Sequence, residues 1–149
     1  MSGNRRVVFG SDHAGFALKG ELVKAAREAG HQVEDLGPLQ DVAVDYPDYA
    51  RLVSEAVAQG RAELGVLVCG TGIGMSISAN KFKGVRAALC RTELEAKMAR
   101  AHNDANVLCL GQRISGPGLA RAILDAFLAA SFEGGRHATR VDKIRAQER

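Results

Sequence analysis

The feature that most constrains the fold is a short apolar run that ends in cysteine and is followed by alternating glycines. Residues 65–69 (GVLVC) are typical of a buried strand. The loop 70–74 (GTGIG) follows, and residues 75–80 can start a helix. Glycines let a backbone approach a ligand closely, and the free N–H groups at a helix start point toward an anion. The segment therefore predicts a strand, a cradle of backbone N–H groups and the Cys69 thiol at its edge.

Strand and helix patterns alternate along the rest of the chain. Further strands are expected at residues 5–10, 32–36, 85–90 and 106–110. Helices are expected at about residues 16–29, 46–59, 92–101, 118–130 and 136–147. This alternation predicts an α/β fold, a three-layer α/β/α sandwich with a five-stranded parallel, Rossmann-like sheet. The length fits one domain over residues 1–149, with ligands at the carboxyl ends of the strands.

Charge and cysteine usage exclude several classes of function. The net charge of +3 is too small to favour nucleic-acid binding. No run approaches the roughly 20 apolar residues of a membrane span, and no signal peptide is apparent. The three cysteines have no paired spacing, which favours reduced thiols in the cytoplasm. Histidines and cysteines also lack the spacing of metal ligands, so no metal site is expected.

The glycine loop matches none of the common nucleotide-binding or phosphatase loops. It lacks the Gly-Lys-Ser/Thr of a Walker A loop, and Met75 stands where G-x-G-x-x-G needs its third glycine. No arginine closes the turn after Cys69, as it would in a cysteine phosphatase. The alternative is a plain strand–helix turn with Cys69 as a small buried side chain. We favour a ligand-binding loop, in which neighbouring amides promote the thiolate form of Cys69; Cys90 and Cys109 are expected in the core.

A second group of polar residues lies near the carboxyl end of the chain. Arg136 and Arg140 share a helix face, with His137 beside them, after two glycines. This arrangement suits a phosphate clamp, although a solvated basic face is the alternative. The pairs 12–13 (DH) and 102–103 (HN) are either acid–base groups or partners of the local backbone. A base, an oxyanion cradle and a phosphate clamp suit proton transfer beside the carbonyl of a phosphorylated substrate.

Six segments carry a more specific likeness: 10–15 (GSDHAG), 45–47 (DYP), 69–74 (CGTGIG), 79–81 (ANK), 102–107 (HNDANV) and 133–137 (EGGRH). Together they resemble the ribose-5-phosphate isomerase B family, which also includes the allose-6-phosphate and galactose-6-phosphate isomerases. The resemblance spans about residues 7–144. It implies interconversion of ribose 5-phosphate and ribulose 5-phosphate through an enediolate, in the pentose phosphate pathway and without a cofactor or metal.

The resemblance also assigns roles to single residues. Cys69 matches the base that moves the proton between C1 and C2, and Met75 stands where another branch of the family uses glutamate. Thr71 and His102 match the pair that opens the furanose ring. The remaining matches are the enediolate loop (Gly70, Gly72, Ile73, Gly74), the sugar-hydroxyl contacts (Asp12, Asn103), the loop lining the site (Asp45, Tyr46) and the phosphate surroundings (His13, Arg113, Arg136, His137, Arg140).

Topology separates two of these groups. His102 and Asn103 precede the fifth expected strand, so they should lie at the amino end of the sheet, opposite Thr71. The resemblance implies a homodimer with sites at its interface, or a tetramer of two such dimers, with the helix at 136–147 packed on the partner. Isomerisation of allose 6-phosphate or galactose 6-phosphate is the nearest alternative. A noncatalytic phosphosugar- or nucleotide-binding module is a further one; a thiol redox role is weaker, because no C-x-x-C motif is present.

Overall fold

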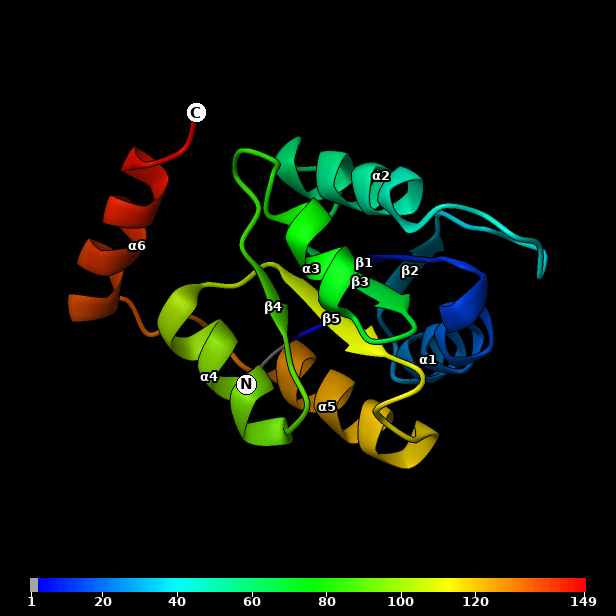
Figure 1. Ribbon diagram of the computed structural model, residues 1–149. Coiled ribbons are helices and arrows are strands. Elements are labelled where there is room, and N and C mark those ends of the chain that lie inside the picture. Colours follow the sequence, from blue (N-terminus) through cyan, green and yellow to red (C-terminus); the bar gives the residue numbers. More distant parts are fainter. Residues whose placement is uncertain (1–2) are drawn as a thin grey trace.

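The computed structural model describes residues 3–149 and has the predicted α/β architecture, with helices on both faces of a parallel sheet (Figure 1). The strands are β1 (Arg6–Ser11), β2 (Gln32–Asp35), β3 (Leu64–Cys69), β4 (Ala87–Leu89) and β5 (Val107–Gly111). The helices are α1 (Phe16–Glu28), α2 (Tyr46–Ala58), α3 (Ile73–Ala79), α4 (Glu93–Asn103), α5 (Pro117–Ala129) and α6 (Arg136–Ala146), with a short 3₁₀ turn at His13–Gly15. The predicted fold class is confirmed, and β4 is shorter than the expected run at 85–90.

The order of the strands places the glycine loop in the middle of the sheet. The order is β2-β1-β3-β5-β4, with every neighbouring pair parallel. After β2 the chain returns past β1 and continues on the other side, so the direction of winding changes between β1 and β3. Ligands of open α/β sheets bind at such a switch point, outside the carboxyl ends of the strands. The loop after β3 begins at this point.

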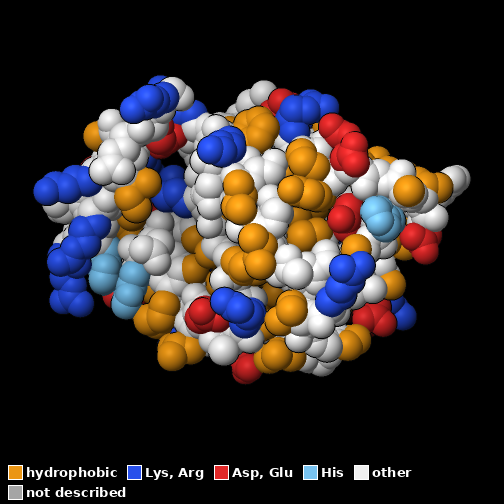
Figure 2. All heavy atoms as spheres, viewed as in Figure 1, with side chains coloured by type: hydrophobic (Ala, Val, Ile, Leu, Met, Phe, Trp, Pro, Cys, Tyr) orange, Lys and Arg blue, Asp and Glu red, His pale blue; other side chains and the backbone are white. Residues whose placement is uncertain are grey.

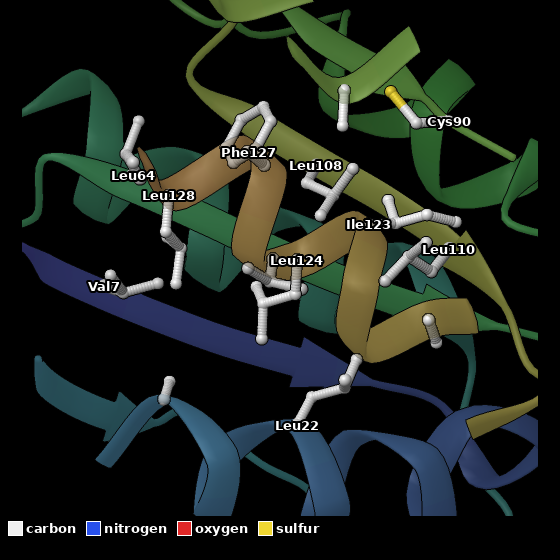
Figure 3. Packing of buried hydrophobic residues seen from close by; sticks show 14 of the residues in the cluster. Val7, Leu22, Leu64, Cys90, Leu108, Leu110, Ile123, Leu124, Phe127 and Leu128 are labelled. Carbon is white, nitrogen blue, oxygen red and sulfur yellow. The ribbon is translucent and has the colours of Figure 1, made fainter. Parts of the chain in front are cut away.

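Apolar side chains fill both layers between the sheet and the helices. Along β1, Val7 and Phe9 point to the layer under α1, α4 and α5, and Val8 points to the layer under α2 and α3. This is the two-residue alternation of a strand covered on both faces. Figure 3 shows side chains of α5, among them Ile123 and Phe127, packed onto the sheet. The core holds the carboxyl ends of the strands, and therefore the loops after them, at fixed positions.

Helix α6 lies apart from the sandwich, beyond the end of α4 (Figure 1). Both apolar and ionic contacts attach it to the rest of the chain: its Val141 side chain is buried, and the Asp104 carboxylate lies 3.8 Å from Arg145. Glu148, just after the helix, accepts a hydrogen bond from the Gly84 N–H. A cleft of about 700 Å³ separates α6 from the segment before β4, and Phe82 and Ile144 are among the residues that line it. Within residues 3–149, no helix has the length and apolar character needed to cross a membrane.

Candidate active site

The loop after β3 forms a cradle of backbone N–H groups around the Cys69 sulfur. The Gly72 N–H donates to Cys69 Sγ at 3.1 Å, and the Ile73 N–H donates to Thr71 Oγ1 at 3.2 Å. Gly72 has φ +81°, and a Cβ there would lie 3.0 Å from the Leu110 carbonyl carbon. Glycine is therefore required both by the backbone conformation and by close packing. Cys69 itself is 5% exposed, so the thiol is covered, and it accepts a hydrogen bond from a backbone donor.

Asp12 directly follows β1, the strand next to the one that ends in Cys69. The register of β1 and β3 pairs Ser11 with Val68, which brings the next two residues side by side. The Asp12 N–H donates to the Val68 carbonyl at 3.3 Å, and Asp12 Oδ1 accepts from the Gly15 N–H at 3.0 Å. This carboxylate therefore caps the short turn after β1, and it lies at the edge of the cradle. Asp12 is therefore a partner of the local backbone, which is one of the two roles that the sequence left open for it.

Two side chains from other loops lie against the glycines of the cradle. The Tyr46 ring, at the start of α2, lies so close to Gly74 that a Cβ there would be 2.6 Å from it. The Arg113 side chain covers Gly70, with a guanidinium nitrogen 3.4 Å from the position of a Cβ. Arg113 also donates its backbone N–H to the Gly70 carbonyl at 2.9 Å. A positive charge beside the backbone N–H groups of this loop favours an oxyanion in the cradle.

The loop before α2 joins the same edge of the sheet. His13 Nδ1 lies 3.3 Å from the Val44 carbonyl oxygen, which links the turn after β1 to this loop. Asp45 is the residue that precedes α2, and its side chain is exposed. The structure therefore collects one group of predicted site residues at the carboxyl edge of the sheet. They are Asp12, His13, Asp45, Tyr46, Cys69, Gly70, Thr71, Gly72, Ile73, Gly74 and Arg113.

The other predicted residues gather at the opposite end of the molecule. His102 and Asn103 end α4 on the amino side of the sheet, and Arg136, His137 and Arg140 lie on α6. Figure 2 shows histidine side chains beside Lys and Arg side chains at the end that carries α6. The topology had predicted that His102 and Thr71 lie at opposite ends of the sheet, and within one chain they do. The glycine-loop cradle and the cluster of His102 with the basic residues of α6 are two separate groups in a single copy.

Glu133 is a member of the second cluster to which the sequence assigned no role. The His102 and His137 rings stack with centroids 4.1 Å apart, and Glu133 Oε1 lies 3.7 Å from His102 Nε2 and 3.6 Å from His137 Nε2. Desolvation, followed by the neighbouring His102 and Arg136, lowers the pKa of the His137 imidazole. The i,i+4 spacing of Glu133 and His137 was the available signal, but the approach of His102 depends on how α4 and α6 pack.

Asp104 is a second residue that the sequence did not single out. Its backbone adopts a left-handed conformation, φ +48°, at the end of α4. Its carboxylate lies 3.3 Å from Arg86, 3.2 Å from Arg100 and 3.8 Å from Arg145. Desolvation lowers the pKa of both Arg86 and Arg100, and the Asp104 charge opposes that shift. Asp104 thus ties α4, α6 and the segment before β4 together behind the second cluster.

Comparison with known proteins places the whole chain among sugar-phosphate isomerases. Escherichia coli ribose-5-phosphate isomerase B is 49% identical over 144 residues, which cover 97% of each chain. The structure of the Trypanosoma brucei type B ribose 5-phosphate isomerase matches with a TM-score of 0.92 and 50% identity, covering 98% of this chain and 100% of the other. That of the Clostridium thermocellum enzyme matches with a TM-score of 0.92 and 48% identity, covering 94% and 95%. The family model described as Ribose/Galactose Isomerase matches residues 7–144, and the chain therefore belongs to the ribose/galactose isomerase family.

Proposed function

We propose that this chain interconverts D-ribose 5-phosphate and D-ribulose 5-phosphate, as a single isomerase domain over residues 1–149. The observation that carries the proposal is the Cys69 sulfur held by the Gly72 N–H at the carboxyl end of β3. Relatives about half identical over nearly the full length bear the name of this enzyme. The reaction belongs to the pentose phosphate pathway, and the three unpaired cysteines suit a reducing cytoplasm.

The proposed reaction moves one proton and one electron pair at a time. The Cys69 thiolate takes the proton from C2 of the open-chain aldose. The C2–H electron pair forms the C1=C2 bond, and O1 becomes the enediolate oxygen beside the N–H groups of residues 70–74 and the Arg113 charge. A proton then passes from the O2 hydroxyl to O1, the Cys69 S–H returns its proton to C1, and the C2=O2 bond forms. Base catalysis of this kind contributes about 10²–10⁴-fold, and one oxyanion donor about 10²–10³-fold.

A second copy of the chain supplies the groups that one copy holds away from the cradle. In the proposed homodimer, the partner's His102 lies beside Thr71 to open the furanose ring, and Asn103 contacts the sugar hydroxyls. Arg136, His137 and Arg140 bind the phosphate together with His13 and Arg113, so α6 packs on the partner. A tetramer would pair two such dimers.

Exposed apolar side chains near the cradle support this arrangement. Ile73 and Ile77 of α3 are 51% and 59% exposed, and Leu94 at the start of α4 is 66% exposed. Figure 2 shows hydrophobic side chains gathered over α3 and the edge strand β4. An apolar surface beside an unpaired strand edge is typical of a protein–protein interface. A covering copy would also exclude water from the cradle.

The first experiment is ribulose 5-phosphate formation from ribose 5-phosphate in the presence of EDTA. We expect the natural chain to be active and Cys69→Ala to lose about 10²-fold or more of its kcat. Cys90→Ala is the matched control, because it removes a buried thiol outside the cradle, and it should keep its activity. Far-UV circular dichroism checks that each variant is folded.

Each other result of this assay would favour an alternative, either for the base or for the function. Full activity in Cys69→Ala would keep the reaction and reject Cys69 as the base. An inactive but folded natural chain would next be assayed with allose 6-phosphate and galactose 6-phosphate. Failure on all three substrates would leave the noncatalytic phosphosugar- or nucleotide-binding module.

A further inference from the structure

Three potential metal ligands converge where α4 ends and α6 begins. His102 comes from the last turn of α4, Glu133 from the connection after α5, and His137 from the first turn of α6. Their ligand atoms all lie within 4.8 Å of one another. His102 lies about 30 residues before the other two, so the sequence shows only the i,i+4 spacing of Glu133 and His137 and not the complete donor set.

The donor set suits a borderline-soft divalent ion. Two imidazoles and one carboxylate bind Zn²⁺ in many sites, with bonds of about 2.0–2.2 Å that place neighbouring ligand atoms about 3.3–3.5 Å apart. The two Nε2–Oε1 distances here, 3.7 and 3.6 Å, are only slightly longer. A metal lies in the plane of each imidazole it binds, so the two stacked rings must splay apart toward it. The side chains of His102 and Glu133, 36% and 58% exposed, have room for this movement, and His137, 11% exposed, stays fixed.

The backbone already holds the three residues together. The Glu133 N–H donates to the Ala101 carbonyl at 2.9 Å, which fixes the connection after α5 against α4. The His137 N–H donates to the Gly134 carbonyl at 3.1 Å, inside the turn that starts α6. Binding therefore requires side-chain rotation rather than movement of the helices.

The surrounding charge selects among divalent ions. Arg136 and Arg140 lie on the same helix and repel any cation, and Glu133 is the one carboxylate within the cluster. Ions that prefer water and several oxygen ligands, such as Mg²⁺, gain too little from one carboxylate to overcome this repulsion. Ions with high affinity for imidazole, such as Zn²⁺ and Ni²⁺, gain two nitrogen ligands.

We propose that His102, Glu133 and His137 form an inhibitory site for imidazole-preferring divalent transition metals, represented by Zn²⁺ and Ni²⁺. The inhibition rests on the proposed function, in which His102 opens the sugar ring and His137 binds the phosphate. An ion held by both imidazoles occupies the nitrogen with which His102 would exchange a proton and the nitrogen whose N–H would donate to the phosphate from His137. Metal and sugar phosphate therefore compete for the same residues.

The binding test uses Ni²⁺ alone and needs no activity. Isothermal titration is performed on the Cys69→Ser chain, so that the cradle thiol contributes no ligand. We expect one ion per chain. Adding Glu133→Gln to this parent should lower the affinity by at least about 10- to 100-fold, which is the cost of losing a residue that only hydrogen-bonds to a metal ligand. Glu21→Gln, which removes an exposed carboxylate from α1, should bind as the parent does, and Mg²⁺ should not bind. Equal affinity in the parent and Glu133→Gln would overturn the site.

The inhibition test uses chains with Cys69 intact. Ni²⁺ should raise the apparent KM for ribose 5-phosphate, EDTA should reverse the effect, and Glu133→Gln should stay active but need about tenfold more Ni²⁺. Equal sensitivity of both chains would overturn the proposed inhibition. Absent Ni²⁺ binding in an active enzyme rejects the metal site and leaves the proposed function standing. Glu133-dependent binding in an inactive chain keeps the site and rejects the function.

Discussion

Cys69 differs from the other two cysteines in its polar contact rather than in its burial. All three thiols are at most 5% exposed. Cys69 Sγ accepts a hydrogen bond from the Gly72 N–H, whereas burial, with a smaller effect of Glu95, raises the pKa of Cys90 to about 12. Burial also raises the pKa of Cys109 above its ordinary value. Because the thiolate is the reactive form of cysteine, the two core thiols should be inert.

Alkylation with iodoacetamide at mildly alkaline pH should therefore modify Cys69 before Cys90 or Cys109. Both core thiols stay protonated until the pH approaches their raised pKa values, and neither has a donor from a glycine loop. Peptide mapping by mass spectrometry measures the three rates in the folded protein. Ribose 5-phosphate should slow modification at Cys69 alone. Equal rates at all three cysteines would contradict a special environment for Cys69.

Gly74→Ala should lower activity without destabilising the chain. The new Cβ would lie 2.6 Å from the Tyr46 ring, which is 39% exposed and can swing away from the cradle. Alanine favours a helix over glycine by about 1 kcal/mol, which offsets the local repacking. We expect kcat/KM to fall by about 10- to 100-fold, as for a small misplacement at a reacting site. Steady-state kinetics and urea unfolding measure the two effects.

Two further variants decide whether Tyr46 transmits this effect. In a Tyr46→Ala background the clash is absent, so adding Gly74→Ala should change kcat/KM little further. Gly20→Ala on α1 is the matched control, because a Cβ there meets nothing within 4 Å. It should raise stability and leave kinetics unchanged. A full additional loss in the Tyr46→Ala background would assign the effect to the backbone of the cradle instead.

At the scale of elements, the sequence predicts what depends on local pattern. The strand at 65–69 and the glycine loop after it were predictable, because an apolar run and alternating glycines are visible in the chain itself. The convergence of Arg86, Arg100 and Arg145 on Asp104 was not, since it depends on how α4, α6 and the segment before β4 pack. The same holds for Glu133 between His102 and His137. Site residues within one loop were therefore easier to find than those shared between helices.

Asp104→Asn tests the ionic attachment of α6. Asparagine tolerates the left-handed backbone at this position, so the substitution removes the charge and keeps the conformation. It leaves Arg100, whose side chain is 8% exposed, without its ionic partner. We expect the free energy of unfolding to fall by roughly 1–3 kcal/mol. Asp142→Asn, at an exposed partner of Arg145, should change it by less than about 0.5 kcal/mol.

Urea unfolding at one fixed protein concentration measures both Asp variants, because association of chains would shift apparent stability. Equal effects of Asp104→Asn and Asp142→Asn would show that the cluster of arginines does not depend on Asp104. Such a result would also show that the position of α6 does not depend on the ion pair between Asp104 and Arg145.

For the whole molecule, the sequence predicts the fold and the separation of the two clusters, but not the geometry of a complete site. Alternating strands and helices determine which end of the sheet each loop occupies, so the distance of His102 from Thr71 followed from topology. In the proposed homodimer, residue roles depend on how two copies meet, which local patterns do not encode. A cradle at one end and basic groups at the other are the reason for proposing the assembled protein, rather than the chain, as the unit of function.

Hybrid dimers test this arrangement directly. Cys69→Ala and His102→Ala chains should each be inactive alone, because each lacks one group at both sites of a symmetric dimer. A hybrid of the two holds one doubly altered site and one intact site, formed by Cys69 of the His102→Ala chain and His102 of the Cys69→Ala chain. Purified by two different affinity tags, the hybrid should therefore have about half the activity of the natural dimer.

If each site lies within one chain, every site in the hybrid lacks one group and activity stays absent. A dimer of two differently tagged Cys69→Ala chains controls for recovery caused by tagging and purification, and it should be inactive. Activity in the His102→Ala homodimer would instead remove His102 from ring opening while leaving Cys69 in place. Half activity in the hybrid alone requires that the cradle of one copy works with the α4–α6 cluster of the other. In that case the separation seen within one chain is the reason this protein must assemble to act.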